Sequence, residues 1–100
     1  MIDLQKKDSV YVLTMDAGEN RWNTTFVREF AKALDEVEKD DGPGALVTRA
    51  QDPKFFSNGL DLDWMKNPAG HPEGGDREVF GEEFMFLMGR MITLPIPSIC

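Results

Sequence analysis

Two short apolar runs on either side of one amphipathic segment constrain the fold more than any other feature of the chain. Residues 10–15 and 45–48 are rich in β-branched side chains and predict strands. Between them, apolar residues recur at i, i+4, i+7, i+8 and i+11, which predicts a helix that is capped by Asn23 or Thr24 and stopped by residues 40–44, D-D-G-P-G. The order strand, helix, strand favours parallel pairing and an α/β fold. The apolar stripe of the helix is Phe26, Phe30, Ala33, Leu34 and Val37.

The flanking segments extend this α/β pattern. Residues 2–5 alternate between apolar and polar and predict a strand that forms a hairpin with residues 10–15 through a polar turn at 6–9. Residues 61–66 predict a short helix, 67–75 a loop rich in glycine and proline, and 98–100 the start of another strand. A second long helix repeats the spacing of the first with Phe80, Phe84, Leu87, Met88 and Met91. Its other faces are also apolar, so we expect it to pack against a further element or subunit.

Composition excludes several classes of function. The 100 residues suffice for one domain, and the 18 acidic against 11 basic side chains give a net charge of −7. This charge argues against nonspecific nucleic-acid binding and against a polybasic membrane-binding segment. One Cys and one His cannot form an intrachain disulfide or a structural zinc site, so no metal is expected. Residues 84–100 are interrupted by Arg90, Pro95 and Pro97, which predicts no membrane insertion.

Chemically useful residues are scarce, and one segment stands out. His71 is isolated in the loop rich in glycine and proline, where we expect it to be exposed to solvent. Asn58-Gly59 favours a sharp turn with positive φ, after which the Leu60 N–H would precede the hydrogen bonding of a helix capped by Asp61. An N–H without an intrahelical partner can donate to a developing oxyanion. The alternative interpretation is an ordinary turn before a capped helix.

The same segment carries a family resemblance. Residues 55–62, F-F-S-N-G-L-D-L, resemble the F-S-x-G-x-D-L signature of the crotonase superfamily, the enoyl-CoA hydratases and isomerases. Residues 19–23, 45–48 and 94–100 resemble the family's first loop, the strand before the signature and a later L-P-x-P-x-I strand. The form S-N-G-L-D-L, with L-P-x-P later, is most similar to the Δ3,Δ2-enoyl-CoA isomerase branch. The resemblance implies the N-terminal portion of a single crotonase domain, a spiral of ββα repeats, which we expect to be truncated at residue 100.

The resemblance also implies roles for individual residues. The Leu60 N–H would be the first of two oxyanion-hole donors to the thioester carbonyl of an acyl-CoA. In the family, the second donor and the catalytic glutamates lie beyond the position of Cys100. No cofactor is expected, because coenzyme A is part of the substrate. The expected substrate-binding residues are Ser57, Asn58, Gly59, Leu60, Asp61, Trp64 and Met65, with Arg21 and Lys54 as candidates for the phosphates of coenzyme A.

Two departures from the family limit the prediction. Asn58 and Leu60 stand where hydratases commonly have small alanines, which leaves the backbone donor intact but changes the pocket. The changed pocket leaves both isomerisation and hydration open. The resemblance to the isomerase branch implies isomerisation of an enoyl-CoA double bond as the expected reaction. We expect an inactive fragment of a cytoplasmic homo-oligomer, a trimer or hexamer, while a peroxisomal address would lie beyond Cys100. The alternatives are a noncatalytic acyl-CoA-binding or oligomerisation module, and an unrelated small α/β domain.

Overall fold

The computed structural model describes residues 1–42, 44–72 and 74–100. Pro43, part of the predicted end of the first helix, and Glu73, part of the predicted loop, lie outside the described residues. The strands are β1 (Ile2–Lys7), β2 (Val10–Met15), β3 (Ala45–Ala50) and β4 (Ser98–Ile99). The helices are α1 (Thr24–Lys39), α2 (Leu62–Lys66) and α3 (Arg77–Thr93), with a 3-10 turn at Pro68–Gly70. This order confirms the predicted α/β pattern.

The strands form one sheet in the order β1-β2-β3-β4. β1 and β2 are antiparallel, whereas β2 with β3 and β3 with β4 are parallel, as the strand-helix-strand order predicted. The predicted turn at 6–9 is wrong at its start, because Lys6 and Lys7 pair with Tyr11 and Val10. Only Asp8 and Ser9 connect the two strands, and Asp8 has a positive φ of 55°. A two-residue connection of this kind matches the twist of a hairpin.

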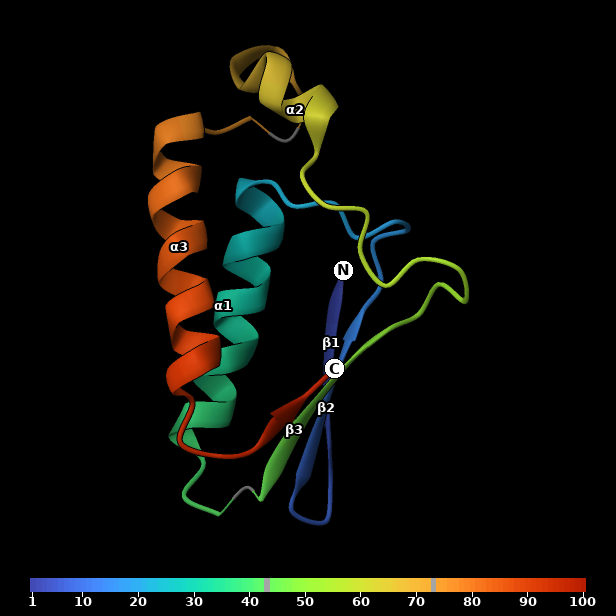
Figure 1. Cartoon of the computed structure of the whole chain (residues 1–100), viewed down its shortest axis with the longest axis vertical. Coiled ribbons are helices and arrows are strands. Elements are labelled where there is room, and N and C mark those ends of the chain that lie inside the picture. The colour runs from blue at the N-terminus through green and yellow to red at the C-terminus, as the bar shows by residue number, and fades with distance from the viewer. Residues whose placement is uncertain (43, 73) are drawn as a thin grey trace.

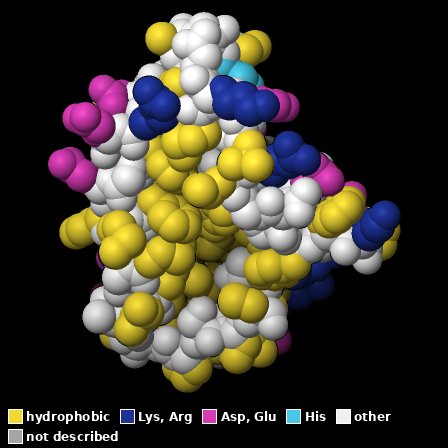
Figure 2. All heavy atoms as spheres, turned by 45° about the horizontal axis from the view of Figure 1, so that its top comes forward, with side chains coloured by type: hydrophobic (Ala, Val, Ile, Leu, Met, Phe, Trp, Pro, Cys, Tyr) yellow, Lys and Arg dark blue, Asp and Glu magenta, His cyan; other side chains and the backbone are white. Residues whose placement is uncertain are grey.

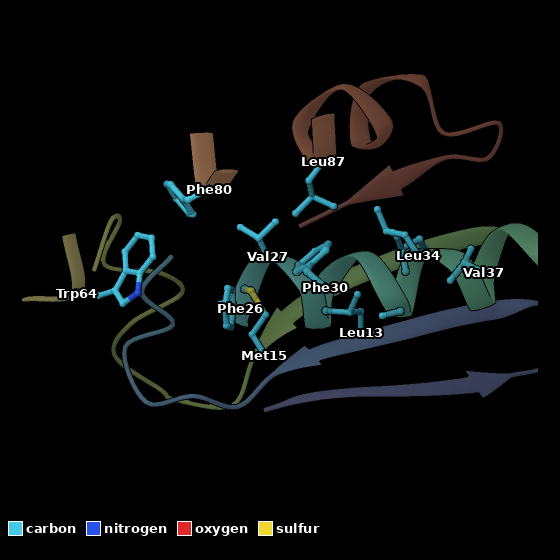
Figure 3. Close-up of a cluster of buried hydrophobic side chains, with 12 residues drawn as sticks. Leu13, Met15, Phe26, Val27, Phe30, Leu34, Val37, Trp64, Phe80 and Leu87 are labelled. Atoms are coloured by element: carbon cyan, nitrogen blue, oxygen red, sulfur yellow. The ribbon is translucent and has the colours of Figure 1, made fainter. Parts of the chain in front are cut away.

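The helices α1 and α3 lie side by side on one face of the sheet, and α2 lies beyond their ends (Figure 1). The predicted stripe of α1 is buried, with no member more than 7% exposed. It packs against Leu13 and Met15 of β2 and Leu46 of β3, while α3 adds Phe80 and Leu87 (Figure 3). The core therefore extends without a break from the sheet through α1 to α3.

Both ends of α1 are fixed by side chains. Asn23 is the N-cap, and its Oδ1 accepts the Phe26 N–H at 2.9 Å. Beyond the other end, one Asp40 oxygen accepts from Lys6 Nζ at 2.5 Å and from the Tyr11 hydroxyl at 2.6 Å. The Lys6 hydrogen bond, then that of Tyr11, holds the pKa of the Asp40 carboxyl well below its ordinary value. The hairpin is thereby joined to the end of α1.

Ion pairs link α1 to α3 along the outer edge of their contact. Arg28 of α1 lies 3.1 Å from Glu83, and Arg90 of α3 lies 2.8 Å from Asp35 and 3.2 Å from Glu38. The outer faces of α3 leave Met85, Phe86 and Ile92 at 71%, 72% and 84% exposure. Within the described parts of the chain, no helix combines the length and the hydropathy needed to cross a bilayer.

Candidate functional site

A parallel bridge between Trp22 and Leu60 organises the candidate site. The Trp22 N–H donates to the Gly59 carbonyl at 2.8 Å, and the Asp61 N–H donates to the Trp22 carbonyl at 2.9 Å. A trans peptide is planar, so its N–H and C=O point in opposite directions. Because the Gly59 carbonyl faces Trp22, the Leu60 N–H of the same peptide points away from Trp22.

The Leu60 N–H has no acceptor among residues 1–42, 44–72 and 74–100. Leu60 itself is 43% exposed, so a ligand on the outer side of the bridge can approach this donor. Gly59 adopts a φ of +75°, the left-handed conformation predicted for the Asn58-Gly59 turn, and Asn58 does not share it. The geometry therefore presents one backbone donor outward at the turn.

Hydrogen bonds fasten the turn to the loop before α1. The Ser57 hydroxyl donates to the Asn20 carbonyl at 2.7 Å, and the Asn58 N–H donates to the Glu19 carbonyl at 2.8 Å. The Gly59 N–H donates to the Ser57 hydroxyl at 3.3 Å. The side chain of Ser57 thus holds the two loops together, a role that the sequence did not indicate.

Asp61 caps α2, as predicted from the sequence. Its Oδ1 accepts the Trp64 N–H at 3.2 Å, and its Oδ2 accepts from Asn23 Nδ2 at 3.0 Å. Asn23 therefore caps α1 with its oxygen while its nitrogen fixes the cap of α2. The two helix starts are held together beside Leu60, and this limits the freedom of the turn between them.

Trp22 connects the bridge to the core, and sequence reasoning assigned it no role in the site. Its ring lies 4.7 Å from that of Phe26 and 5.3 Å from that of Phe84, measured between centroids. Both contacts are edge-to-face, a favoured geometry for aromatic pairs. In the sequence, Trp22 is visible only as an aromatic residue beside a helix cap. Its role depends on Leu60, which lies 38 positions along the chain, so no local pattern predicts it.

Trp64 and Met65, predicted to border the acyl pocket, lie on the inner side of α2. Trp64 is fully buried, its ring 5.3 Å from Phe80 and its indole N–H donating to the Gly74 carbonyl. Met65 is half-buried and packs against the same core. In this structure Trp64 supports α2 from beneath, and Met65 is the more accessible of the two.

The structure places the two predicted phosphate contacts in different hollows. Arg21 borders a hollow of about 420 Å³ that also contains Asp61, Asp63 and His71, and it forms an ion pair with Glu19 at 2.6 Å. His71 is half-buried there, which differs from the expected exposure. Lys54 borders a separate hollow of about 380 Å³.

The hollow beside Lys54 lies at the carboxyl ends of β3 and β4. Thr48, Arg49, Asp52, Phe56 and Cys100 also line it. The Asp52 Oδ1 accepts the backbone N–H groups of Lys54 at 2.7 Å and Phe55 at 3.0 Å. Arg49 donates to Thr14 Oγ1 and Gln51 Oε1, both neutral, and no described carboxylate lies within ion-pair distance of Arg49 or Lys54. The buried Thr48 hydroxyl has no described partner. With two cations and one carboxylate, this hollow suits an anion better than the hollow around Arg21, where Asp61 and Asp63 lie beside an arginine already paired with Glu19.

No group of three or more His, Cys, Asp or Glu side chains in the described ranges could hold a metal ion. The groups described above offer hydrogen-bond donation from the Leu60 backbone and positive charge from Arg49 and Lys54.

Comparison with curated proteins finds enoyl-CoA delta isomerases. The chain is 28% identical to the peroxisomal enoyl-CoA delta isomerase 2 of Arabidopsis thaliana and 30% identical to the peroxisomal isomerase 1 of the same plant. Each match covers 99% of this chain but 42% and 40% of the relative. The chain thus spans about two fifths of the length of these relatives. No protein-family model matches the chain.

Solved structures give the same result for the fold. A probable enoyl-CoA hydratase from Mycobacterium tuberculosis has a TM-score of 0.81 at 25% identity, and a second structure of the same protein, described as an enoyl-CoA isomerase, has 0.77 at 27%. Each match covers 98% of this chain and 40% of the other. The resemblance to the crotonase superfamily and the partial crotonase fold are confirmed, and the alternative of an unrelated α/β domain is set aside.

Proposed function

The chain is similar to crotonase-superfamily enzymes over nearly its whole length, and on that premise we propose that it forms the part of an enoyl-CoA isomerase that supplies one oxyanion-hole donor. The observation that carries the proposal is the outward Leu60 N–H without a described acceptor. It donates to the carbonyl oxygen of an acyl-CoA thioester. When a proton leaves the adjacent carbon, negative charge collects on this oxygen, and one such donor contributes about 3 kcal/mol to its stabilisation.

The phosphates of coenzyme A lie toward Lys54 in this proposal. Lys54 and Arg49 border one hollow without described carboxylate partners, whereas Glu19 already neutralises Arg21. We therefore favour Lys54 over Arg21 among the two predicted cations. A charged contact of this kind strengthens binding most where the cation is not already paired.

The remaining expected residues shape the route between these two ends. The backbone at Ser57, Asn58 and Gly59 borders the ligand, and Asp61 fixes the end of the turn. Met65 borders the acyl chain, and Trp64 supports Met65 and the rest of α2 from the core. Coenzyme A belongs to the substrate, so the proposal requires no separate cofactor. The family places its second donor and its catalytic glutamates beyond the position of Cys100, so the 100-residue chain binds acyl-CoA without turning it over.

Calorimetry with hexanoyl-CoA, an acyl-CoA without a double bond, tests the donor. Leu60→Pro removes the N–H, which no described residue uses, and Leu60→Ala is the matched control because it changes the side chain and keeps the donor. We expect Leu60→Pro to weaken binding about tenfold or more, and Leu60→Ala to change it by less than about threefold. Failure of the native chain to bind, or equal affinities for both variants, would contradict the proposal.

Lys54→Ala tests the orientation of the ligand, with Lys32→Ala on the charged face of α1 as its control. Lys32 is 75% exposed and lies away from the hollow. Lys54→Ala is expected to weaken binding of hexanoyl-CoA but not of hexanoyl-pantetheine, which lacks the nucleotide phosphates. An equal loss for both ligands would count against a phosphate contact. An assay with 3-hexenoyl-CoA tests the second claim, because turnover by the 100-residue chain would refute it.

A noncatalytic oligomerisation module is the second candidate, and the exposed apolar faces of α3 favour it. Met85, Phe86 and Ile92 of α3 are more than two-thirds exposed. Hydrophobic side chains also gather over a hollowed face of the molecule (Figure 2). Contiguous apolar surface, such as the area that Figure 2 shows, often marks an interface. Sedimentation of the full-length protein, in which the enzyme proposal expects a trimer or hexamer, combined with a turnover assay separates the two functions. Assembly without turnover would favour the module.

The cellular location also belongs to the proposal. We expect a cytoplasmic protein, and two of the Arabidopsis relatives are named peroxisomal. Imaging of the full-length protein, tagged at its N-terminus so that a C-terminal address stays readable, distinguishes the two compartments.

A further inference from the structure

Asn20 is the most completely bonded polar residue at the candidate site. It is 0% exposed, and its Nδ2 donates to the Phe56 carbonyl at 2.9 Å and more weakly to the Met15 carbonyl at 3.4 Å. Its Oδ1 accepts the Ala17 N–H at 3.0 Å. One N–H donor and two carbonyl acceptors surround the amide, so they also fix which end is oxygen and which is nitrogen.

The backbone of Asn20 narrows the choice of side chain further. Its φ is +52°, a conformation that glycine, asparagine and aspartate tolerate best. Glycine has no amide, and an ionised aspartate cannot donate to the Phe56 and Met15 carbonyls. Asparagine alone among these three residues satisfies both the backbone and the surrounding groups.

The contacts of Asn20 continue directly to the Leu60 peptide. Its side chain holds the Phe56 carbonyl and its own carbonyl holds the Ser57 hydroxyl. Next along the chain, the Asn58 N–H donates to the Glu19 carbonyl. The two backbone hydrogen bonds that join Trp22 to Gly59 and Asp61 follow. The segment 56–61 therefore lies along 19–22 in a ladder that starts at a buried amide and ends at the peptide that carries the Leu60 N–H.

We propose that Asn20 is a positioning residue that sets the direction of the Leu60 N–H through this ladder. The proposal rests on the proposed function, because the direction of this donor affects chemistry only if a thioester carbonyl binds there. Asn20 touches no reacting atom in this role. The hydrogen bond from Asn20 to the Phe56 carbonyl fixes the start of segment 56–61. The Gly59 carbonyl therefore continues to accept from the Trp22 N–H, and the Leu60 N–H continues to point to the opposite side.

Amide hydrogen exchange of the 100-residue chain, measured by NMR without ligand, tests the positioning role. Asn20→Gly keeps the positive φ and removes the amide, and Asn67→Gly is the control, because Asn67 is an exposed cap of the 3-10 turn. We expect Asn20→Gly to accelerate exchange at Trp22 and Asp61 about tenfold while amides within α1 keep their native rates. Unchanged exchange at Trp22 and Asp61, or equal acceleration in α1, would overturn the proposal.

Asn20→Asp provides a second variant with an internal rescue. The ionised carboxylate cannot donate to the Phe56 carbonyl, whereas the protonated acid can donate one hydrogen bond. We therefore compare the exchange protection of the Asp61 amide in Asn20→Asp with that in native protein at each pH. The variant is expected to lose this protection at neutral pH and to recover it in acid. A protection ratio that does not vary with pH would contradict the assigned contact.

Titration with hexanoyl-CoA then separates this proposal from the proposed function. Donation to the thioester is expected to move the Leu60 amide proton downfield in native protein and less so in Asn20→Gly, with affinity about tenfold weaker. If the native Leu60 proton does not respond while Asn20→Gly still accelerates exchange, the proposed function fails and the positioning of the peptide stands. If both proteins respond equally, Asn20 does not position the donor.

Discussion

Helices α1 and α3 have the same apolar spacing and nearly equal lengths, 16 and 17 residues, but they are covered very differently. Seven residues of α1 are buried, against two described residues of α3. The side of α1 away from the core carries charged side chains, whereas α3 is apolar around most of its circumference. The shared apolar stripe thus determines that each segment forms a helix and which of its faces is buried. The residues on the remaining faces determine how much further apolar surface each helix presents for burial.

The largest expected effect contrasts the two helices directly. Leu34 of α1 is fully buried and Ile92 of α3 is 84% exposed. Leu34→Ala is expected to lower the free energy of unfolding by about 2–5 kcal/mol, because it leaves a cavity in the core. Ile92→Ala removes surface side chain only and is expected to change the free energy by less than about 0.5 kcal/mol. Urea denaturation measures both, and similar losses would contradict the contrast.

A second substitution tests the covered stripe of α3. Leu87 is 1% exposed, so Leu87→Ala is expected to cost about 2 kcal/mol, near the lower end for such changes because one side of α3 is open and the site can relax. Met85→Ala, on an exposed face of the same helix, is the control. If Leu87→Ala has no more effect than Met85→Ala, the packing of α3 on α1 is not formed in solution.

The contacts of Asp40 at the C-terminal end of α1 predict that stability depends on pH. The folded-state pKa of Asp40 is lowered by Lys6 and then Tyr11, so this contribution to stability is complete above the unfolded pKa of about 4 and declines as the pH falls toward the lower folded value. Asp40→Asn is expected to lower the melting temperature at pH 7 by less than Leu34→Ala or Leu87→Ala does. The variant is also expected to lose less stability than native protein as the pH falls. Parallel acid profiles for native and variant protein would contradict this account.

The smallest expected effect concerns the ion pairs between the helices. Arg90 is 17% exposed in its side chain, and its partners Asp35 and Glu38 are 55% and 41% exposed. Arg90→Met keeps an apolar stem and should cost less than about 1 kcal/mol. The loss should shrink at high salt, because exposed charges are screened. A larger loss that salt does not change would point to packing of the stem instead.

The sequence predicted the elements whose order and periodicity are local. The α1 stripe, a cap at Asn23 or Thr24 and the parallel pairing of β2 with β3 were all predicted, because each depends on spacing within one segment or between neighbours. The structure selects Asn23 as the cap. The start of the first turn was wrong, since Lys6 and Lys7 are polar yet continue the hairpin pairing. Polar side chains do not end strand pairing in an edge strand, because one side of such a strand faces solvent.

The site was predictable in part for the same reason. Gly59 and Asp61 carry local signals, a turn glycine and a helix cap, and the structure confirms both. Asn20 and Trp22 act on residues 36 to 38 positions away, and no local pattern reports such contacts. The division of Arg21 and Lys54 between two hollows also depends on tertiary structure, because both looked equally available in the sequence.

The central claim is that the Leu60 N–H donates to a thioester carbonyl. The most direct measurement is the infrared difference spectrum of hexanoyl-CoA labelled with ¹³C at the thioester carbonyl and bound to the protein at saturation. A hydrogen bond withdraws electron density from the carbonyl, so we expect a band at lower frequency than in water for native protein and for Leu60→Ala. Leu60→Pro should return the band toward its frequency in water. A saturated native complex with the carbonyl band at its frequency in water would contradict the account.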